Sequence, residues 1–216
     1  MNRWICLDEE TKQALRHGAQ PSTVQGRMRV RSEAWFRQLR LGRLRGMSPR
    51  FAFRPLTHAD LPLLHEWLNR PHVAEWWEGE VSLEYVASTY GADIGSPVIR
   101  QMLACIDGVP TGYIQDYHVM GADPEWWKEE TDPGARGIDQ YLANAEQLGQ
   151  GLGSAMVQQY VTRLFADPAV TKVQTDPSPT NLRAIRAYEK AGFRREREVL
   201  TPDGPALLML VHRPTR

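Results

Sequence analysis

The feature that most restricts the fold of this chain is a glycine-rich segment between a predicted strand and a predicted helix. The strand covers Gly137–Ala143, the segment is Leu148-Gly149-Gln150-Gly151-Leu152-Gly153, and the helix covers Ser154–Phe165. Glycine lets a backbone approach a ligand closely, and the first amides of a helix have no carbonyl partners within that helix. Phosphate binds readily at such a helix N-terminus. All six residues of the segment are therefore candidates for binding a phosphate-bearing cofactor.

Two other kinds of phosphate-binding loop fit the sequence less well. A dinucleotide-binding fold would place the loop after its first strand and an acidic residue about 20 residues further on. Here the loop follows four predicted strands, and no such acid follows the next strand. A P-loop needs Gly-Lys-Ser/Thr, and that tripeptide does not follow these glycines. The segment predicts an anion site of another class.

The elements around the loop alternate between strands and helices, which is typical of an α/β domain. Thr57 can cap a helix because Asp60 stands three residues later and apolar residues follow at helical spacing. A four-residue turn, Asp107-Gly108-Val109-Pro110, separates the strands of one predicted hairpin. The other predicted elements are strands at Phe51–Pro55, Met102–Ile106, Thr111–Tyr117 and Thr171–Asp176, a helix at Asn181–Ala191, and a terminal hairpin of Phe193–Val199 and Ala206–Val211.

The first 50 residues differ from the remainder in charge. Residues 1–50 carry eleven Lys or Arg and four Asp or Glu, whereas residues 51–216 carry fifteen and twenty-two. A basic arm is typical of nucleic-acid or membrane-surface binding, and an acidic body favours a cationic ligand. The alternative is a leader with no part in catalysis, since Met47 precedes the first predicted strand. We expect a basic N-terminal extension at 1–50, outside a catalytic domain at 51–216.

The overall composition indicates a globular protein, with 42% hydrophobic and 24% charged residues. No stretch has the roughly 18–20 consecutive apolar residues of a membrane helix, and the N-terminus has no apolar core of a secretory signal. The two cysteines, Cys6 and Cys105, have no metal-binding or redox spacing, and Cys105 stands in an apolar run. We expect a cytoplasmic protein without a metal ion.

A second motif, Asn181-Leu182-Arg183-Ala184-Ile185-Arg186-Ala187-Tyr188-Glu189-Lys190-Ala191-Gly192-Phe193, follows the glycine loop by about thirty residues. Together the two motifs resemble the GNAT superfamily of acetyltransferases, in which such a loop holds the pyrophosphate of coenzyme A. Leu148 departs from the family pattern, which has Gln or Arg there. The resemblance implies acetyl-CoA as co-substrate, with Asn181 near its pantetheine arm. It implies Tyr188 as the acid that protonates the departing thiolate.

The resemblance also implies a fold class: an α/β GNAT acyltransferase domain with a central mixed, mostly antiparallel sheet flanked by helices. Two strands of this sheet splay apart and hold acetyl-CoA. Backbone amides around Gln140 and Leu142, on one splayed strand, would bind the thioester carbonyl as an oxyanion hole.

Further segments resemble aminoglycoside 6'-N-acetyltransferases within this superfamily, almost continuously over residues 51–213. Among them are Glu75-Trp76-Trp77, Trp126-Trp127, Arg136-Gly137-Ile138-Asp139-Gln140, Gln174-Thr175-Asp176-Pro177-Ser178-Pro179 and Thr201-Pro202-Asp203-Gly204-Pro205. Aminoglycosides carry several ammonium groups on sugar rings, so carboxylates and flat aromatic side chains suit them. The substrate-binding candidates are Trp77, Asp123, Trp127, Asp139, Asp176 and Asp203.

The resemblance makes Asp139, expected at a strand end, the residue nearest the reacting 6'-amine. This amine arrives as an ammonium, and Asp139 takes its proton directly or through water, or only holds the amine in place. The family often has an Asp just before the second Trp pair, whereas this chain has Asp123-Pro124-Glu125. The corresponding ammonium contact therefore falls to Asp123 or Glu125.

Two other functions remain open from the sequence. A GNAT enzyme can acetylate a different amine, on a polyamine, a peptide or a protein, and an acidic body suits these as well. A nucleic-acid-binding protein would use the basic arm and bind in a salt-sensitive way. We expect neither nucleic acid nor membrane as a partner, and the sequence leaves monomer and dimer open.

Overall fold

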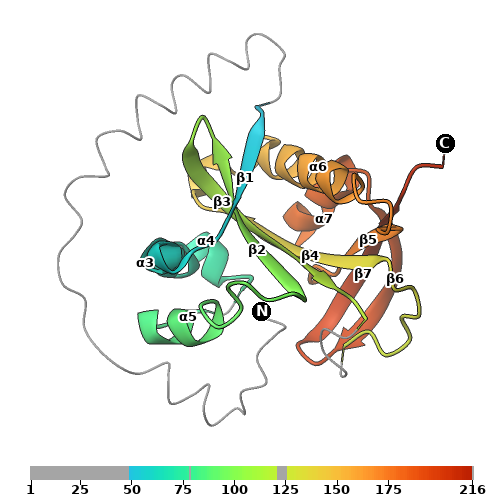
Figure 1. Cartoon of the computed structure of the whole chain (residues 1–216), viewed down its shortest axis with the longest axis horizontal. Coiled ribbons are helices and arrows are strands. Elements are labelled where there is room, and N and C mark those ends of the chain that lie inside the picture. The colour runs from blue at the N-terminus through green and yellow to red at the C-terminus, as the bar shows by residue number, and fades with distance from the viewer. Residues whose placement is uncertain (1–48, 78, 121–125, 216) are drawn as a thin grey trace.

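The computed structural model describes residues 49–77, 79–120 and 126–215, which form one seven-stranded sheet with helices on both faces (Figure 1). The strand order is β1-β2-β3-β4-β5-β7-β6. The elements are β1 (Phe51–Pro55), η1 (His58–Asp60), α3 (Leu61–Leu68), α4 (Pro71–Ala74), α5 (Leu83–Thr89), β2 (Ile99–Ile106), β3 (Val109–His118), β4 (Ala135–Leu142), η2 (Ala145–Gln147), α6 (Leu152–Leu164), β5 (Lys172–Thr175), α7 (Leu182–Lys190), β6 (Arg194–Thr201) and β7 (Gly204–His212).

The sheet is antiparallel at every junction except that between β4 and β5, which run parallel. These two strands pair only from Ala135↔Lys172 to Gly137↔Gln174. Beyond Gly137, β4 continues to Leu142 along β3, while β5 continues along β7. The sheet therefore splays open between its central strands, as the sequence predicted.

The helices cover the two faces unequally. On one face, α3, α4 and α5 pack on β2, β3 and β4, with Leu64, Leu68, Val86 and Tyr113 fully buried between them. On the other face, α6 packs on β1, β2 and β4, and α6 and α7 share a buried cluster with β5 and β7 (Figure 1). The face that α3–α5 cover in the first half of the sheet has no covering helix among the described residues in the second half.

The predicted elements are confirmed with small shifts of their ends. Thr57 and Asp60 form a reciprocal capping box at η1, and Arg54 donates two hydrogen bonds to Asp60, at 2.6 and 2.7 Å. These bonds hold the pKa of the Asp60 carboxyl well below its usual value. Cys105 is a buried core residue, as its apolar surroundings predicted, while Cys6 lies outside the described residues.

One predicted turn is wrong in length. The β2–β3 turn contains only Asp107 and Gly108, with φ values of 50° and 77°, and Val109 and Pro110 belong to β3. Two consecutive positive φ values make the tight hairpin turn whose twist matches that of the flanking strands. The shorter turn lengthens β3.

Candidate active site

The glycine-rich segment forms the turn between η2 and α6, immediately after the splayed end of β4. Gly149 and Gly151 have φ values of 69° and 80°, in the left-handed region that favours glycine. A Cβ atom added to either would meet nothing within 4 Å, so their role is conformational and leaves open space above the turn. Gly151 is the N-cap of α6 and has no side chain, so the first amides of the helix face this open space.

Three other residues of the loop contribute differently from the prediction. The Leu148 amide donates to the Ala145 carbonyl at 3.0 Å and its side chain packs against an apolar cluster, so this amide belongs to the η2 turn. Leu152 buries its side chain in the same cluster, which leaves only its backbone for a ligand. The exposed Gln150 donates a side-chain hydrogen bond to the Glu146 carbonyl. An anion at this turn would therefore contact mainly the backbone from Gly149 to Gly153.

A cavity of about 350 Å³ lies against this loop and brings the two sequence motifs together. It is bounded by the end of β4, the start of α6, one side of α7 and the end of α4. Burial lowers the pKa of His72 in its wall, and His72 Nε2 lies 3.0 Å from the Leu142 carbonyl oxygen. The predicted cofactor-binding residues that line this cavity are Gln140, Leu142, Leu148, Gly149, Gly151, Gly153 and Asn181.

The two predicted residues on α7 lie in different surroundings. Asn181 is the N-cap of α7, and its Oδ1 accepts the Ala184 amide at 3.0 Å. Tyr188 is only 4% exposed, and its ring packs edge-to-face on Phe193 at 5.4 Å. Its neighbour Ala187 lines the cavity, whereas Tyr188 does not. A role for Tyr188 in proton transfer therefore remains a prediction.

Sequence reasoning missed several residues of this cavity. Arg183, Arg186 and Lys190 line it from α7, and their spacing of three and four residues places them on one helical face. This spacing was a readable signal for a cationic wall that suits phosphate groups. Trp76 Nε1 and Tyr141 Oη also belong to lining residues, are buried, and have no hydrogen-bond partner among the described residues. Their tertiary placement has no comparable sequence signal.

Asp139 lies in the middle of β4, not at a strand end as expected, because β3 pairs with β4 from Gly112↔Leu142 to His118↔Arg136. Its carboxylate is 9% exposed, and its Oδ2 accepts Gln115 Nε2 at 3.0 Å. The Gln115 Oε1 atom in turn accepts the Tyr113 hydroxyl at 2.7 Å. Burial raises the pKa of Tyr113, so this phenol stays a neutral donor. The chain of hydrogen bonds fixes the orientation of Asp139.

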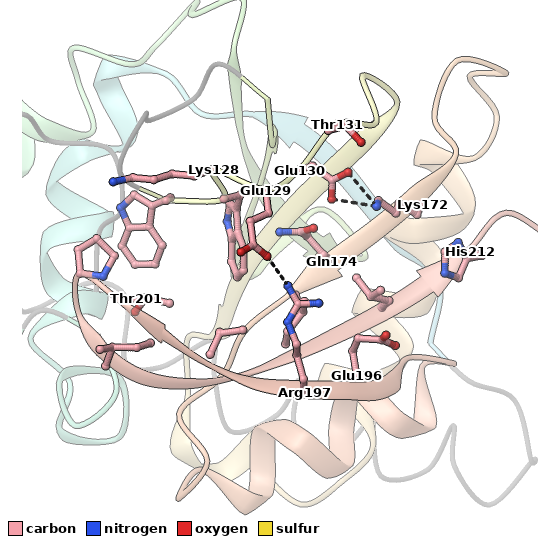
Figure 2. Close-up of a pocket in the computed structure, with 17 residues that line it drawn as sticks. Lys128, Glu129, Glu130, Thr131, Lys172, Gln174, Glu196, Arg197, Thr201 and His212 are labelled. Atoms are coloured by element: carbon pink, nitrogen blue, oxygen red, sulfur yellow. Dashed lines mark hydrogen bonds and ion pairs between the residues drawn. The ribbon is translucent and has the colours of Figure 1, made fainter.

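A second and larger cavity, of about 770 Å³, lies over the half of the sheet formed by β5, β7 and β6 (Figure 2). Trp126, Trp127 and the four residues after them form one wall. Gln174, Leu208 and Leu210 from the sheet form the floor, and Thr201 and Pro202 stand at the β6–β7 end. Aromatic faces, an apolar floor and several charged groups thus share this hollow.

Two ion pairs cross from the wall of the larger cavity to the sheet (Figure 2). Lys172 Nζ lies 2.8 Å from Glu130 Oε2, and both side chains are mostly buried. Arg197 Nη2 lies 3.4 Å from Glu129 Oε2, and both side chains are exposed. The buried pair holds the wall in place, whereas the exposed pair is open to competition by a bound cation.

Of the predicted substrate-binding residues that the structure describes, only the two tryptophans line either cavity, and they line different ones. Trp127 lines the larger one. Asp176 directly follows β5 and is 6% exposed, and the exposed Asp203 lies in the β6–β7 turn beside the larger cavity's Pro202. Trp77 lines the smaller cavity, donates from Nε1 to the Tyr90 hydroxyl at 2.6 Å and packs edge-to-face on Tyr141. Asp123 lies outside the described residues.

Asp139 lies between residues that line the two cavities, although it lines neither of them itself. The smaller one begins at Gln140, the next residue of β4. The larger one contains Gln174, which pairs with Gly137 two residues before Asp139. A phosphate-bearing cofactor in one cavity and a cationic acceptor in the other would meet beside this carboxylate.

Comparison with known proteins places this geometry in a family. Residues 57–201 match the family described as "Acetyltransferase (GNAT) domain". The chain belongs to the GNAT acetyltransferase family. Its mixed, mostly antiparallel sheet with flanking helices is the fold expected for this family.

Three individual relatives are more specific than the family match. The chain is 53% identical over 165 residues to aminoglycoside N(6')-acetyltransferase type 1 of Klebsiella pneumoniae, covering 73% of this chain and 80% of the relative. It is 69% identical over 85 residues to a kanamycin resistance protein of Rhizobium radiobacter, covering 39% and 79%. The crystal structure of AAC(6')-Ib in complex with coenzyme A and kanamycin superposes with a TM-score of 0.73 at 52% identity, covering 76% of this chain and 95% of the other.

Two features are absent from the described part of the chain. None of its helices is long and apolar enough to cross a bilayer. No group of three or more His, Cys, Asp or Glu side chains is arranged there to hold a metal ion.

Proposed function

We propose that this GNAT enzyme transfers the acetyl group of acetyl-CoA to the 6'-amine of aminoglycoside antibiotics and thereby confers resistance. The observation that carries the proposal is the position of Asp139 between two different cavities. The smaller has a glycine turn, a helix N-terminus and a cationic α7 wall, which suit coenzyme A. The larger has tryptophans and carboxylates, which suit a sugar with ammonium groups. The kanamycin and coenzyme A bound by AAC(6')-Ib support this pairing.

The reaction needs three events, and residues of this chain are assigned to each. Asp139 receives a proton from the 6'-ammonium, directly or through water, so that the amine lone pair attacks the thioester carbonyl carbon. Backbone amides around Gln140 and Leu142, beyond the last β4–β5 pair, stabilise the oxyanion. The carbon–sulfur bond then breaks, Tyr188 protonates the thiolate of coenzyme A, and the second proton that leaves the nitrogen passes through water to replace the one that Tyr188 gave up. The products are an acetamide and free coenzyme A.

We further propose that residues 51–216 form the catalytic domain and that residues 1–50 lie outside it. The family match over 57–201 supports this division. A variant that starts at Met47 should retain its acetyl-transfer rate, whereas loss of folded enzyme would place the extension within the fold. We also propose that the enzyme acts in the cytoplasm, where acetyl-CoA is present, and that neither nucleic acid nor a membrane is its partner.

The decisive assay compares acceptors. Purified protein with acetyl-CoA should release the coenzyme A thiol rapidly with kanamycin, and mass spectrometry should find one acetyl group on the 6'-nitrogen. Spermidine and a peptide with a free N-terminus serve as comparison acceptors for the rival amine classes. Greater efficiency, as kcat/KM, with either of them than with kanamycin would overturn the proposed substrate.

A further inference from the structure

The side-chain amide of Gln174 is a buried polar group at the floor of the larger cavity. It lies on β5, is 1% exposed and lines the cavity (Figure 2). Its Nε2 atom has no hydrogen-bond partner among the described residues. Burying an amide without a hydrogen bond destabilises a fold, and native proteins keep few such groups. An unpartnered amide at a cavity surface therefore points to a ligand that completes its hydrogen bonds.

The sheet register places this amide close to Asp139, where the amine of the acceptor is expected. Gln174 pairs with Gly137 on one side and with Leu210 on the other, at the last pair before β4 and β5 diverge. Asp139 stands two residues beyond Gly137, and Asp176 two residues beyond Gln174. Residues two positions apart along a strand lie on the same face, as Gly137 and Asp139 do on β4, whereas Asp176 lies just past the end of β5. Gln174 thus lies at the base of the splay, before the two carboxylates.

The groups around Gln174 indicate which kind of ligand atom its amide binds. Carboxylates bind ammonium groups, and the Lys172 ammonium beside it is already held by Glu130. An amide N–H is a neutral donor, which suits a neutral oxygen better than a cation. Figure 2 shows Gln174 between the Lys172–Glu130 and Arg197–Glu129 pairs. Because these pairs flank the amide, an oxygen atom of a ligand would reach it from the cavity.

We propose that Gln174 is a further substrate-binding residue, which donates a hydrogen bond to a hydroxyl or ether oxygen of the aminoglycoside. This inference rests on the proposed function, because it needs the sugar to occupy the larger cavity. It gives the site a contact that a linear polyamine, which has no oxygen, cannot make. Gln174 thereby favours amino sugars over other polycations.

The test is Gln174→Met, which keeps the length of the side chain and removes the amide. The KM for kanamycin should rise roughly five- to tenfold, while kcat and the KM for acetyl-CoA stay unchanged. The melting temperature without ligand should stay equal or rise, because an apolar side chain of similar shape removes an unsatisfied buried group. A purely structural glutamine gives the opposite pattern: a lower melting temperature and an unchanged KM for kanamycin.

The chain offers a matched control in Gln101, a buried glutamine on β2 that lines neither cavity and whose Oε1 also lacks a partner among the described residues. Gln101→Met should leave the KM for kanamycin unchanged. A measurement on the wild type does not depend on whether a variant folds. The NMR resonance of the Gln174 side-chain NH₂ group should shift when kanamycin is added, and should not shift when coenzyme A is added. If the wild type acetylates kanamycin but this resonance does not shift, the proposed role of Gln174 is wrong. If the wild type does not acetylate kanamycin at all, the proposed function itself is wrong.

Discussion

The two cavities differ in how the chain builds them. The smaller one takes most of its wall from two short stretches, residues 140–154 and 181–190, in which neighbours in space are also neighbours in sequence. The larger one takes its wall from residues 126–131 and from three strands, which become neighbours only through the order β5-β7-β6. Local motifs therefore describe the cofactor side of this enzyme well, whereas the acceptor side depends on the register of the sheet.

The largest expected effect tests the motif on α7. Tyr188→Phe removes one hydroxyl and should lower kcat by roughly 10²–10⁴-fold if protonation of the thiolate limits the rate. Tyr160→Phe is the matched control, since Tyr160 is a buried tyrosine that donates to Asp116 and lines neither cavity. A Tyr188→Phe enzyme with full turnover would assign Tyr188 to the packing against Phe193 alone.

The next effect tests the glycine turn. Gly151→Asp places a carboxylate where the pyrophosphate is expected, so the KM for acetyl-CoA should rise tenfold or more because of like-charge repulsion. Gly151→Asn is the control, because Asn also tolerates a positive φ and has nearly the same shape without the charge. Equal KM values for the two variants would show that the phosphates bind elsewhere.

A smaller effect, on stability, is expected at Gly137, where β4 and β5 form their last pair. A Cβ atom on Gly137 would lie 1.9 Å from Cζ of the Tyr117 ring, so Gly137→Ala should lower the free energy of unfolding by about 2 kcal/mol through overpacking. Gly153→Ala is the control, since its new Cβ would meet only Leu142 Cδ1 at 3.8 Å. Denaturant unfolding that leaves Gly137→Ala as stable as the wild type would contradict this packing.

The smallest effects separate the two ion pairs of the larger cavity. Lys172→Met leaves the mostly buried Glu130 without its partner and should cost about 2 kcal/mol of unfolding free energy. Arg197→Met breaks an exposed pair and should cost less than about 1 kcal/mol. Equal losses in thermal unfolding would mean that both pairs hold the wall to the same degree.

The α/β alternation and the loop were predicted from local patterns, whereas the GNAT fold class and the splayed strands were implied by the family resemblance that the two motifs carry. Sequence reasoning placed Asp139 at a strand end because the resemblance does not report how far β3 and β4 pair, and this pairing runs past Asp139 to Leu142. It predicted Trp77 as part of a sugar-binding wall, which stays a prediction, but it did not indicate the contacts of Trp77 with Tyr90 and Tyr141, which depend on how α5 packs on the sheet. The Lys172–Glu130 and Arg197–Glu129 pairs join residues 42 and 68 positions apart, and no local pattern reports such contacts.

A crystal structure of this enzyme with coenzyme A and kanamycin tests the central claim, the position of Asp139 between two cavities, most directly. We predict the pyrophosphate on the backbone amides after Gly151, a kanamycin oxygen at Gln174, and the 6'-nitrogen about 3 Å from the Asp139 carboxylate. Kanamycin bound outside the larger cavity, or with its 6'-nitrogen turned away from Asp139, would contradict the account.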